Sequence, residues 1–348
     1  MLYDIKQTLM IRSARKSAGL DKRSRSLFLT VLIFLLVASI SISLPQSAVS
    51  SVVISITLIQ DADFMALLSD PSTTSEQMAE AMLSLAESIP SWAYVPVIAA
   101  SGLAALFAIL YCKLFEKRRA FSIGFNKRGF FSEYLGGLII GAVMISLPAL
   151  ACHLSKGIVF SRVIAPNALA ILGFFAAFIL QALGEEALFR GYLLTSIARR
   201  YPIWVAIIGS SSIFAFFHTS NQSFSFIAFT NLLLFGIFAS LIMLKRGSIW
   251  MSAAIHAAWN FVQGNVFGIN VSGNPKFDSI FTSELGKIGK ILSGGEFGLE
   301  GGLGVTIILL IGILMALLSE TKKCEIAPVE TEEEGKNGEE RPEQSATA

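Results

Sequence analysis

Charged residues are scarce in this chain of 348 residues: Asp, Glu, Lys and Arg make up 15% of the sequence, whereas 53% is hydrophobic. Soluble globular domains carry about 25% charged residues, so this composition excludes an ordinary soluble protein, and we expect no nucleic-acid partner. Cysteine is also rare, and the spacing of Cys112, Cys152 and Cys324 suits neither a disulfide framework nor a metal cluster. Histidine occurs three times. A histidine inside an apolar segment is therefore a candidate functional residue.

Apolar runs of about twenty residues, the length of a membrane-spanning helix, recur along the chain. The predicted fold class is all-α, a polytopic membrane bundle of about eight transmembrane helices. The runs are 27–44, 93–111, 134–151, 167–189, 203–217, 224–244, 248–267 and 304–318.

Lys and Arg are concentrated in segments that these runs place on one side of the membrane. The first 26 residues are basic, whereas 45–92 contains no Lys or Arg and several acidic residues. Positive charge marks the cytoplasmic side, so we predict cytoplasmic termini and an integral protein of a prokaryotic cell membrane. The other basic residues on the predicted inner side are Lys113, Lys117, Arg118, Arg119, Lys127, Arg128, Arg199, Arg200, Lys245, Arg246, Lys322 and Lys323.

Composition divides the chain into segments of different character. A short surface helix is expected within 61–91, an amphipathic piece on the membrane surface at 279–292, and disorder in the tail, which has too few apolar residues to pack. The predicted division is a basic N-terminus (1–26), N-terminal spans with an extracytoplasmic loop at 45–92 (27–165), a core (166–268), an outer segment with the last span (269–320) and a disordered cytoplasmic tail (321–348).

Two ionisable residues lie deep in apolar runs at matching heights. Glu185 precedes Tyr201 by sixteen residues, and His218 follows Pro202 by sixteen. A tight turn between Tyr201 and Pro202 makes the two helices antiparallel, so both side chains reach nearly the same level and can meet. Buried ionisable groups are costly, and their pairing indicates a functional site.

The residues next to Glu185 assign it a role. Glu186 and Arg190 are four apart on one helical face and form a natural ion pair, which leaves Glu185 to face another helix. A carboxylate without such a partner in a dry site suits a general base. The Glu186–Arg190 pair by itself is explained by a structural role.

A third pair of polar residues, His256 and Asn260, has the same four-residue spacing. An imidazole and an amide on one helical face are donors that stabilise an oxyanion. The alternative is structural, because His and Asn also hydrogen-bond between membrane helices. Taken alone, these two residues favour the structural interpretation.

The three motifs together, Glu185-Glu186-x-x-x-Arg190, Phe214-x-x-x-His218 and His256-x-x-x-Asn260, resemble those of a known family. This is the CAAX protease and bacteriocin-processing family of intramembrane proteases, also called the Abi family and including type II CAAX prenyl endopeptidases. The resemblance covers about 166–268. It implies that Glu185 and His218 activate a water, that His256 and Asn260 bind the oxyanion, and that Glu186 and Arg190 support the site.

The resemblance also implies a peptide or protein substrate, in prenylated or membrane-anchored form. We favour a reaction without a cofactor. A zinc-dependent protease with Glu185, His218 and His256 as metal ligands is an alternative, although the sequence has no His-Glu-x-x-His run. A non-catalytic membrane scaffold or immunity protein, held together by these polar residues, is another. A transporter that uses Glu185 as a proton site is disfavoured, because the chain has one small cluster of buried charge.

Overall fold

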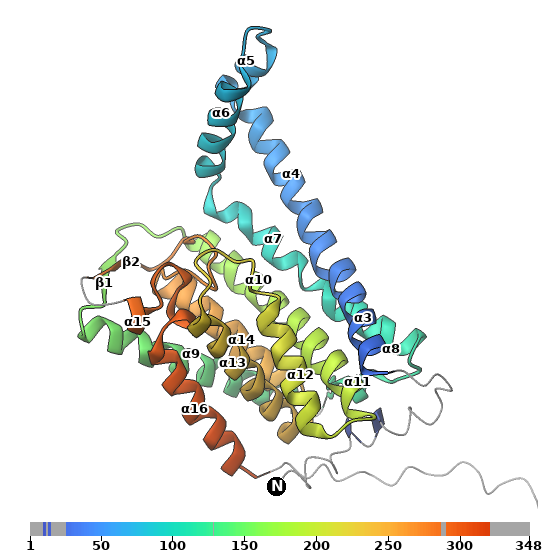
Figure 1. Ribbon diagram of the computed structural model, residues 1–348. Coiled ribbons are helices and arrows are strands. Elements are labelled where there is room, and N and C mark those ends of the chain that lie inside the picture. Colours follow the sequence, from blue (N-terminus) through green and yellow to red (C-terminus); the bar gives the residue numbers. More distant parts are fainter. Residues whose placement is uncertain (1–9, 12, 15–25, 128, 287–289, 321–348) are drawn as a thin grey trace, which may run out of the picture.

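The computed structural model describes residues 10–11, 13–14, 26–127, 129–286 and 290–320. It shows a mostly helical integral membrane protein (Figure 1). In these ranges five helices are long and apolar enough to cross a membrane: Leu27–Gln60, Ser91–Leu114, Phe130–Leu154, Ala168–Ala198 and Phe226–Arg246.

The predicted number of about eight spans is not confirmed. The runs at 203–217, 248–267 and 304–318 form α-helices of 14, 12 and 16 residues. At 1.5 Å per residue these helices measure about 18–24 Å, which is less than the hydrocarbon core of a bilayer.

In chain order the elements are α3 (Leu27–Ala38), η1 (Ser39–Ser43), α4 (Leu44–Gln60), α5 (Ala62–Ser69), α6 (Ser75–Ser88), η2 (Ser91–Ala93), α7 (Tyr94–Ala100), α8 (Leu103–Leu114), η3 (Ala120–Ile123), α9 (Phe130–Leu154), β1 (Ile158–Arg162), α10 (Ala168–Glu186), η4 (Ala187–Leu194), α11 (Thr195–Ala198), α12 (Ile203–Phe216), α13 (Phe226–Arg246), α14 (Trp250–Phe261), η5 (Val262–Val266), β2 (Phe281–Leu285), α15 (Lys290–Ser293), η6 (Gly295–Phe297), η7 (Leu299–Gly301) and α16 (Leu303–Leu318).

The first long helix runs from α3 through the π-helical segment η1 into α4, and it extends well past the predicted end at Leu44. Pro45 does not stop the helix, because it occupies the first turn after η1, where proline is tolerated. None of the α4 residues, all of which are described, is buried. The predicted surface helix is confirmed as α5 and α6, which form a hairpin at the tip of α4 (Figure 1).

Helix α14 lies inside the bundle, packed against α9 on one side and α10 on the other. Small residues let these backbones approach closely. A Cβ added at Gly141 of α9 would lie 2.4 Å from the Ile255 carbonyl oxygen of α14, and one at Gly184 of α10 would lie 2.3 Å from the Ser101 carbonyl oxygen. Glycine is therefore required where α10 passes the α7–α8 junction.

One end of the bundle, here called the basic end, collects most of the described positive charge. There Lys245 donates to the Leu317 carbonyl oxygen over 2.8 Å, and Arg246 lies 3.4 Å from Glu133. These contacts join the end of α13 to the end of α16 and the start of α9. The Lys and Arg residues at this end are Lys113, Lys117, Arg118, Arg119, Lys127, Arg199, Arg200, Lys245 and Arg246.

The opposite end contains the exception to the predicted all-α class. Strand β1 pairs antiparallel with β2, so Phe281–Leu285, inside the amphipathic piece predicted at 279–292, forms one strand of a two-stranded sheet. The residues that pair with Phe281–Leu285 lie 119 to 127 positions earlier in the chain, a contact that local periodicity cannot reveal. The predicted disordered tail, 321–348, and nearly all of the basic N-terminus lie outside the described residues.

Candidate active site

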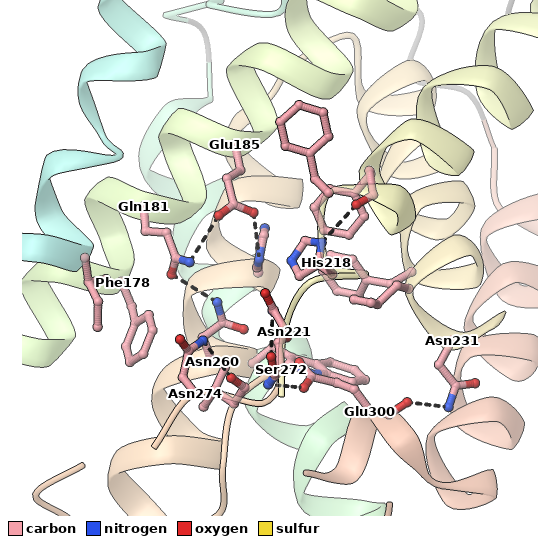
Figure 2. Close-up of a pocket in the computed structure, with 18 of the residues that line it drawn as sticks. Phe178, Gln181, Glu185, His218, Asn221, Asn231, Asn260, Ser272, Asn274 and Glu300 are labelled. Atoms are coloured by element: carbon pink, nitrogen blue, oxygen red, sulfur yellow. Dashed lines mark hydrogen bonds and ion pairs between the residues drawn. The ribbon is translucent and has the colours of Figure 1, made fainter. Parts of the chain in front are cut away.

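A cavity of about 220 Å³ lies among α10, α12, α13 and α14 (Figure 2). Four of the six sequence-predicted site residues line it: Glu185, His218, His256 and Asn260. The two predicted supporting residues, Glu186 and Arg190, are fully buried beside it. The structure therefore brings all six into one region.

Glu186, Arg190 and His256 form a buried charged triad behind the cavity. Arg190 Nη1 lies 2.9 Å from Glu186 Oε1, the pairing predicted from their spacing. The same carboxylate oxygen lies 3.2 Å from His256 Nδ1. The Arg190 guanidinium also stacks on the Phe214 ring, 4.3 Å from its centroid. The Glu186 carboxylate accepts a hydrogen bond from Nδ1–H of His256, and this bond sets the orientation of the imidazole ring. It also holds the His256 side chain of α14 against α10.

The triad forms at the junction of α10 with the π-helical segment η4, which begins at Ala187. π-Helical turns are rare and occur frequently at functional sites. Gly191 lies within this segment, where a Cβ would come 2.9 Å from the Ile123 carbonyl oxygen. The wide turn and the missing Cβ together let η4 pack tightly on η3 while Arg190 remains aimed at Glu186.

Glu185 faces α14 and lies on the cavity side of the same helix. Its Oε2 is 3.8 Å from His256 Nε2, and its Oε1 accepts a hydrogen bond of 3.1 Å from Gln181 Nε2. Gln181 in turn accepts a hydrogen bond of 3.2 Å from Asn260 Nδ2. A polar chain thus runs from Asn260 through Gln181 and Glu185 to His256 (Figure 2).

His218 lies just past the end of α12 and faces the same cavity (Figure 2). Its Nδ1 is 2.9 Å from the Phe214 carbonyl oxygen, one turn earlier. A carbonyl accepts only, so Nδ1 carries the proton, and the neutral ring has its lone pair on Nε2. His218 therefore presents an acceptor to the cavity.

The zinc alternative uses Glu185, His218 and His256 as ligands. In the part of the chain that the structure describes, no group of three or more His, Cys, Asp or Glu side chains could hold a metal ion. Glu186 lies on the Nδ1 side of His256, and the Nε2 side of the ring faces Glu185 at 3.8 Å.

The segment that carries these residues has a recognisable relative. Residues 167–262 match the type II CAAX prenyl endopeptidase Rce1-like family. The match contains all three motifs and α10 through α14, and it confirms the resemblance seen in the sequence. The matched family is a protease family. No curated protein and no solved structure matches the chain.

Within the Rce1-like segment, sequence reasoning missed Gln181. It lies four residues before Glu185, so the same spacing rule that joined Glu186 to Arg190 would have found it.

The sequence also gave no signal for Glu300, which lines the cavity from outside the Rce1-like segment. Its Oε2 accepts from the Ser272 N–H over 2.7 Å and from Gln263 Nε2 over 3.1 Å. Glu300 lies in η7, outside the spanning helices, and burial raises the pKa of its carboxyl above the ordinary value despite these hydrogen bonds. Only the folded chain brings η7 to the site.

Proposed function

We propose that the protein is an intramembrane endopeptidase that hydrolyses a peptide bond with an activated water, like the CAAX-type proteases whose family model it matches. The observation that carries the proposal is the cavity in Figure 2, whose lining includes His218, His256, Glu185, Gln181 and Asn260 within an apolar bundle. Ionisable groups gathered in an apolar bundle indicate proton transfer.

In this proposal Glu185 and His218 activate the water. Gln181 holds one oxygen of Glu185, and the carbonyl of Phe214 keeps the Nε2 lone pair of His218 directed at the cavity. The water oxygen attacks the substrate carbonyl carbon while its proton passes to this pair. The same proton later goes to the leaving amine as the C–N bond breaks, so the site returns to its starting state.

His256 and Asn260 stabilise the oxyanion that forms at the carbonyl oxygen. Because the Nδ1 of His256 faces Glu186, the Nε2 side of the ring is the side that can reach the oxyanion. Glu186 and Glu185 lie on opposite sides of the ring and hold it in position. Arg190 neutralises Glu186 and keeps it in position.

No cofactor takes part in the proposed reaction, and the substrate is a membrane-anchored or prenylated peptide or protein. The protein is proposed to act in the cell membrane of a prokaryote, with both termini in the cytoplasm. Chelation is expected to leave cleavage unchanged. Loss of cleavage with a strong chelator, restored by one equivalent of zinc, would contradict the metal-free reaction.

The test of the function is Glu185→Gln, which keeps the shape of the side chain and its hydrogen bond to Gln181. We expect wild-type amounts of folded protein and a fall in cleavage of about 10²–10⁴-fold. Comparative proteomics of membranes from wild-type and variant cells would detect substrate termini that require Glu185. Glu76→Gln, at an exposed position on α6, is the matched control and should cleave normally.

The scaffold interpretation makes the opposite forecast. If Glu185→Gln membranes contain the same termini as the wild type, and the variant protects or binds as well as the wild type, the residue is not catalytic. The polar side chains would then serve to hold the helices together.

A further inference from the structure

The direction in which the cavity opens is determined by loops at the end of the bundle opposite the basic end. Asn221 follows α12 and Asn274 follows η5; both line the cavity, and Asn274 is exposed. Asn221 Nδ2 donates to the Ser272 carbonyl oxygen over 2.7 Å and thereby joins the two loops. Because the exposed Asn274 lines the cavity from this end, the mouth lies here and is polar.

Toward the basic end the cavity is closed by packed aromatic rings. Phe189 lines the cavity and lies 5.2 Å from Phe34 of α3, measured between ring centroids. Phe34 lies 6.0 Å from both Tyr192 and Phe217, and Tyr111 of α8 lies 4.9 Å from Tyr192. Phe34 is completely buried, and Phe189 and Tyr192 are 1% exposed. Close-packed rings of this kind leave no path for a peptide.

A buried ionic cluster forms a second layer below these rings. Glu116 Oε2 lies 2.8 Å from Arg118 and 3.0 Å from Arg199. Ser196 donates to the same carboxylate over 3.1 Å and accepts from Arg118 over 2.9 Å. These contacts join α11 to the segment after α8. These buried contacts form a second packed layer, so the basic end is closed by two layers.

Charge differs between the two ends in the direction that the positive-inside rule requires. Lys156, Arg162, Lys276 and Lys290 are the described basic residues of the opposite end, and they are dispersed. Acidic residues outnumber them there. They include Asp61, Asp63, Asp70, Glu76, Glu80, Asp278, Glu284 and Glu296. Since Lys and Arg cluster in cytoplasmic segments, the basic end belongs in the cytoplasm and the mouth of the cavity does not.

We infer that the catalytic cavity opens on the extracytoplasmic side of the membrane, and that its substrate is a peptide segment exposed on that face. That the peptide is a substrate rests on the proposed function. The orientation of the cavity does not depend on that function. The long first helix fits this arrangement, because its Ile42 and Gln46 line the cavity and α4 continues from there to the α5–α6 hairpin at the same end (Figure 1).

Cysteine accessibility in the full-length protein tests the orientation. Asn274→Cys places a thiol at the mouth, and Lys127→Cys places one at an exposed position of the basic end. Cys112 and Cys152 are buried and are retained, while Cys324 is replaced by Ser. With a membrane-impermeant maleimide, Asn274→Cys should be labelled in right-side-out vesicles and protected in inverted ones. Lys127→Cys should show the reverse.

A second outer position keeps the test decisive. Ser220→Cys, in the exposed loop after α12, should behave like Asn274→Cys. Labelling of either outer position in inverted vesicles, with Lys127→Cys labelled in right-side-out vesicles, would overturn the inferred orientation.

Cleavage is then measured with a library of random peptides on a single-span anchor, displayed on one face or the other. Glu185-dependent cleavage of outward-facing peptides supports the substrate class, and cleavage restricted to inward-facing peptides overturns it. Cleavage on neither face, with the expected labelling, would count against the protease and leave the orientation established. The two failures are thus distinguishable.

Discussion

Removing Arg190 tests how the triad behind the cavity is stabilised. The Glu186 side chain is 0% exposed and that of Arg190 is 1% exposed, and their charged atoms are 2.9 Å apart. Arg190→Met keeps an unbranched chain of similar reach but leaves the Glu186 carboxylate buried without its cation. It also removes the guanidinium from the Phe214 ring, 4.3 Å away.

The expected cost follows from burial. Breaking a fully buried ion pair from one side costs about 3–5 kcal/mol, because the remaining charge has lost its partner and cannot reach water. Removing both charges with Glu186→Gln and Arg190→Met leaves no uncompensated charge, so the double variant should be more stable than Arg190→Met alone. His256 loses its carboxylate in the double variant, which should reduce cleavage although stability recovers.

The assay is unfolding in mixed detergent micelles, with increasing denaturing detergent, for the wild type, both single variants and the double variant. The coupling free energy is the difference between the double variant and the sum of the singles. A coupling within about 0.5 kcal/mol of zero would show that the two charges act independently. The reasoning from a mutually compensated buried pair would then be refuted.

Four further variants test other parts of the site and the bundle. Gln181→Leu removes the hydrogen bond to Glu185 and should lower kcat about tenfold, the effect of ~1.4 kcal/mol, in a peptide cleavage assay; unchanged kcat would show that the bond is dispensable. The pKa of Glu300 is raised in the folded protein, so folding favours the neutral carboxyl. The stability of the wild type should therefore fall as pH rises from about 4.5 through the raised pKa, whereas that of Glu300→Gln should not. Unfolding measured as a function of pH checks this difference. Gly184→Ala places a Cβ 2.3 Å from a backbone carbonyl oxygen and should destabilise the fold by about 1–3 kcal/mol. Gly136→Ala, with ordinary contact at 3.7 Å, should be neutral or stabilising, and equal unfolding midpoints for the two would contradict the close approach.

The predicted and observed side-chain contacts agree where both residues lie on one helix. The four-residue spacing of Glu186 and Arg190 gave their ion pair, because neighbouring turns of one helix fix that distance. The same rule applies to Gln181, which the motifs did not include. The contact of Glu186 with His256 joins two helices 70 residues apart, so no local pattern contains it.

The extent of the helices was predictable only in part. Hydropathy located the apolar runs but not their ends: the first helix continues to Gln60, because Pro45 falls where a proline is tolerated. The segment Phe281–Leu285 became a strand because β1 offers it a hydrogen-bonding edge. A partner distant in sequence decided its conformation.

The sequence by itself determined that this is a helical membrane protein, which residues carry ionisable groups into its apolar interior, and which family its core resembles. These properties depend on composition and on spacing within single helices. Only the tertiary structure decided that Glu186 holds His256, that Glu300 joins the cavity from the far end of the chain, and that packed rings close the cavity toward the basic end. Each of these depends on contacts between segments distant in sequence, which form only when the helices pack.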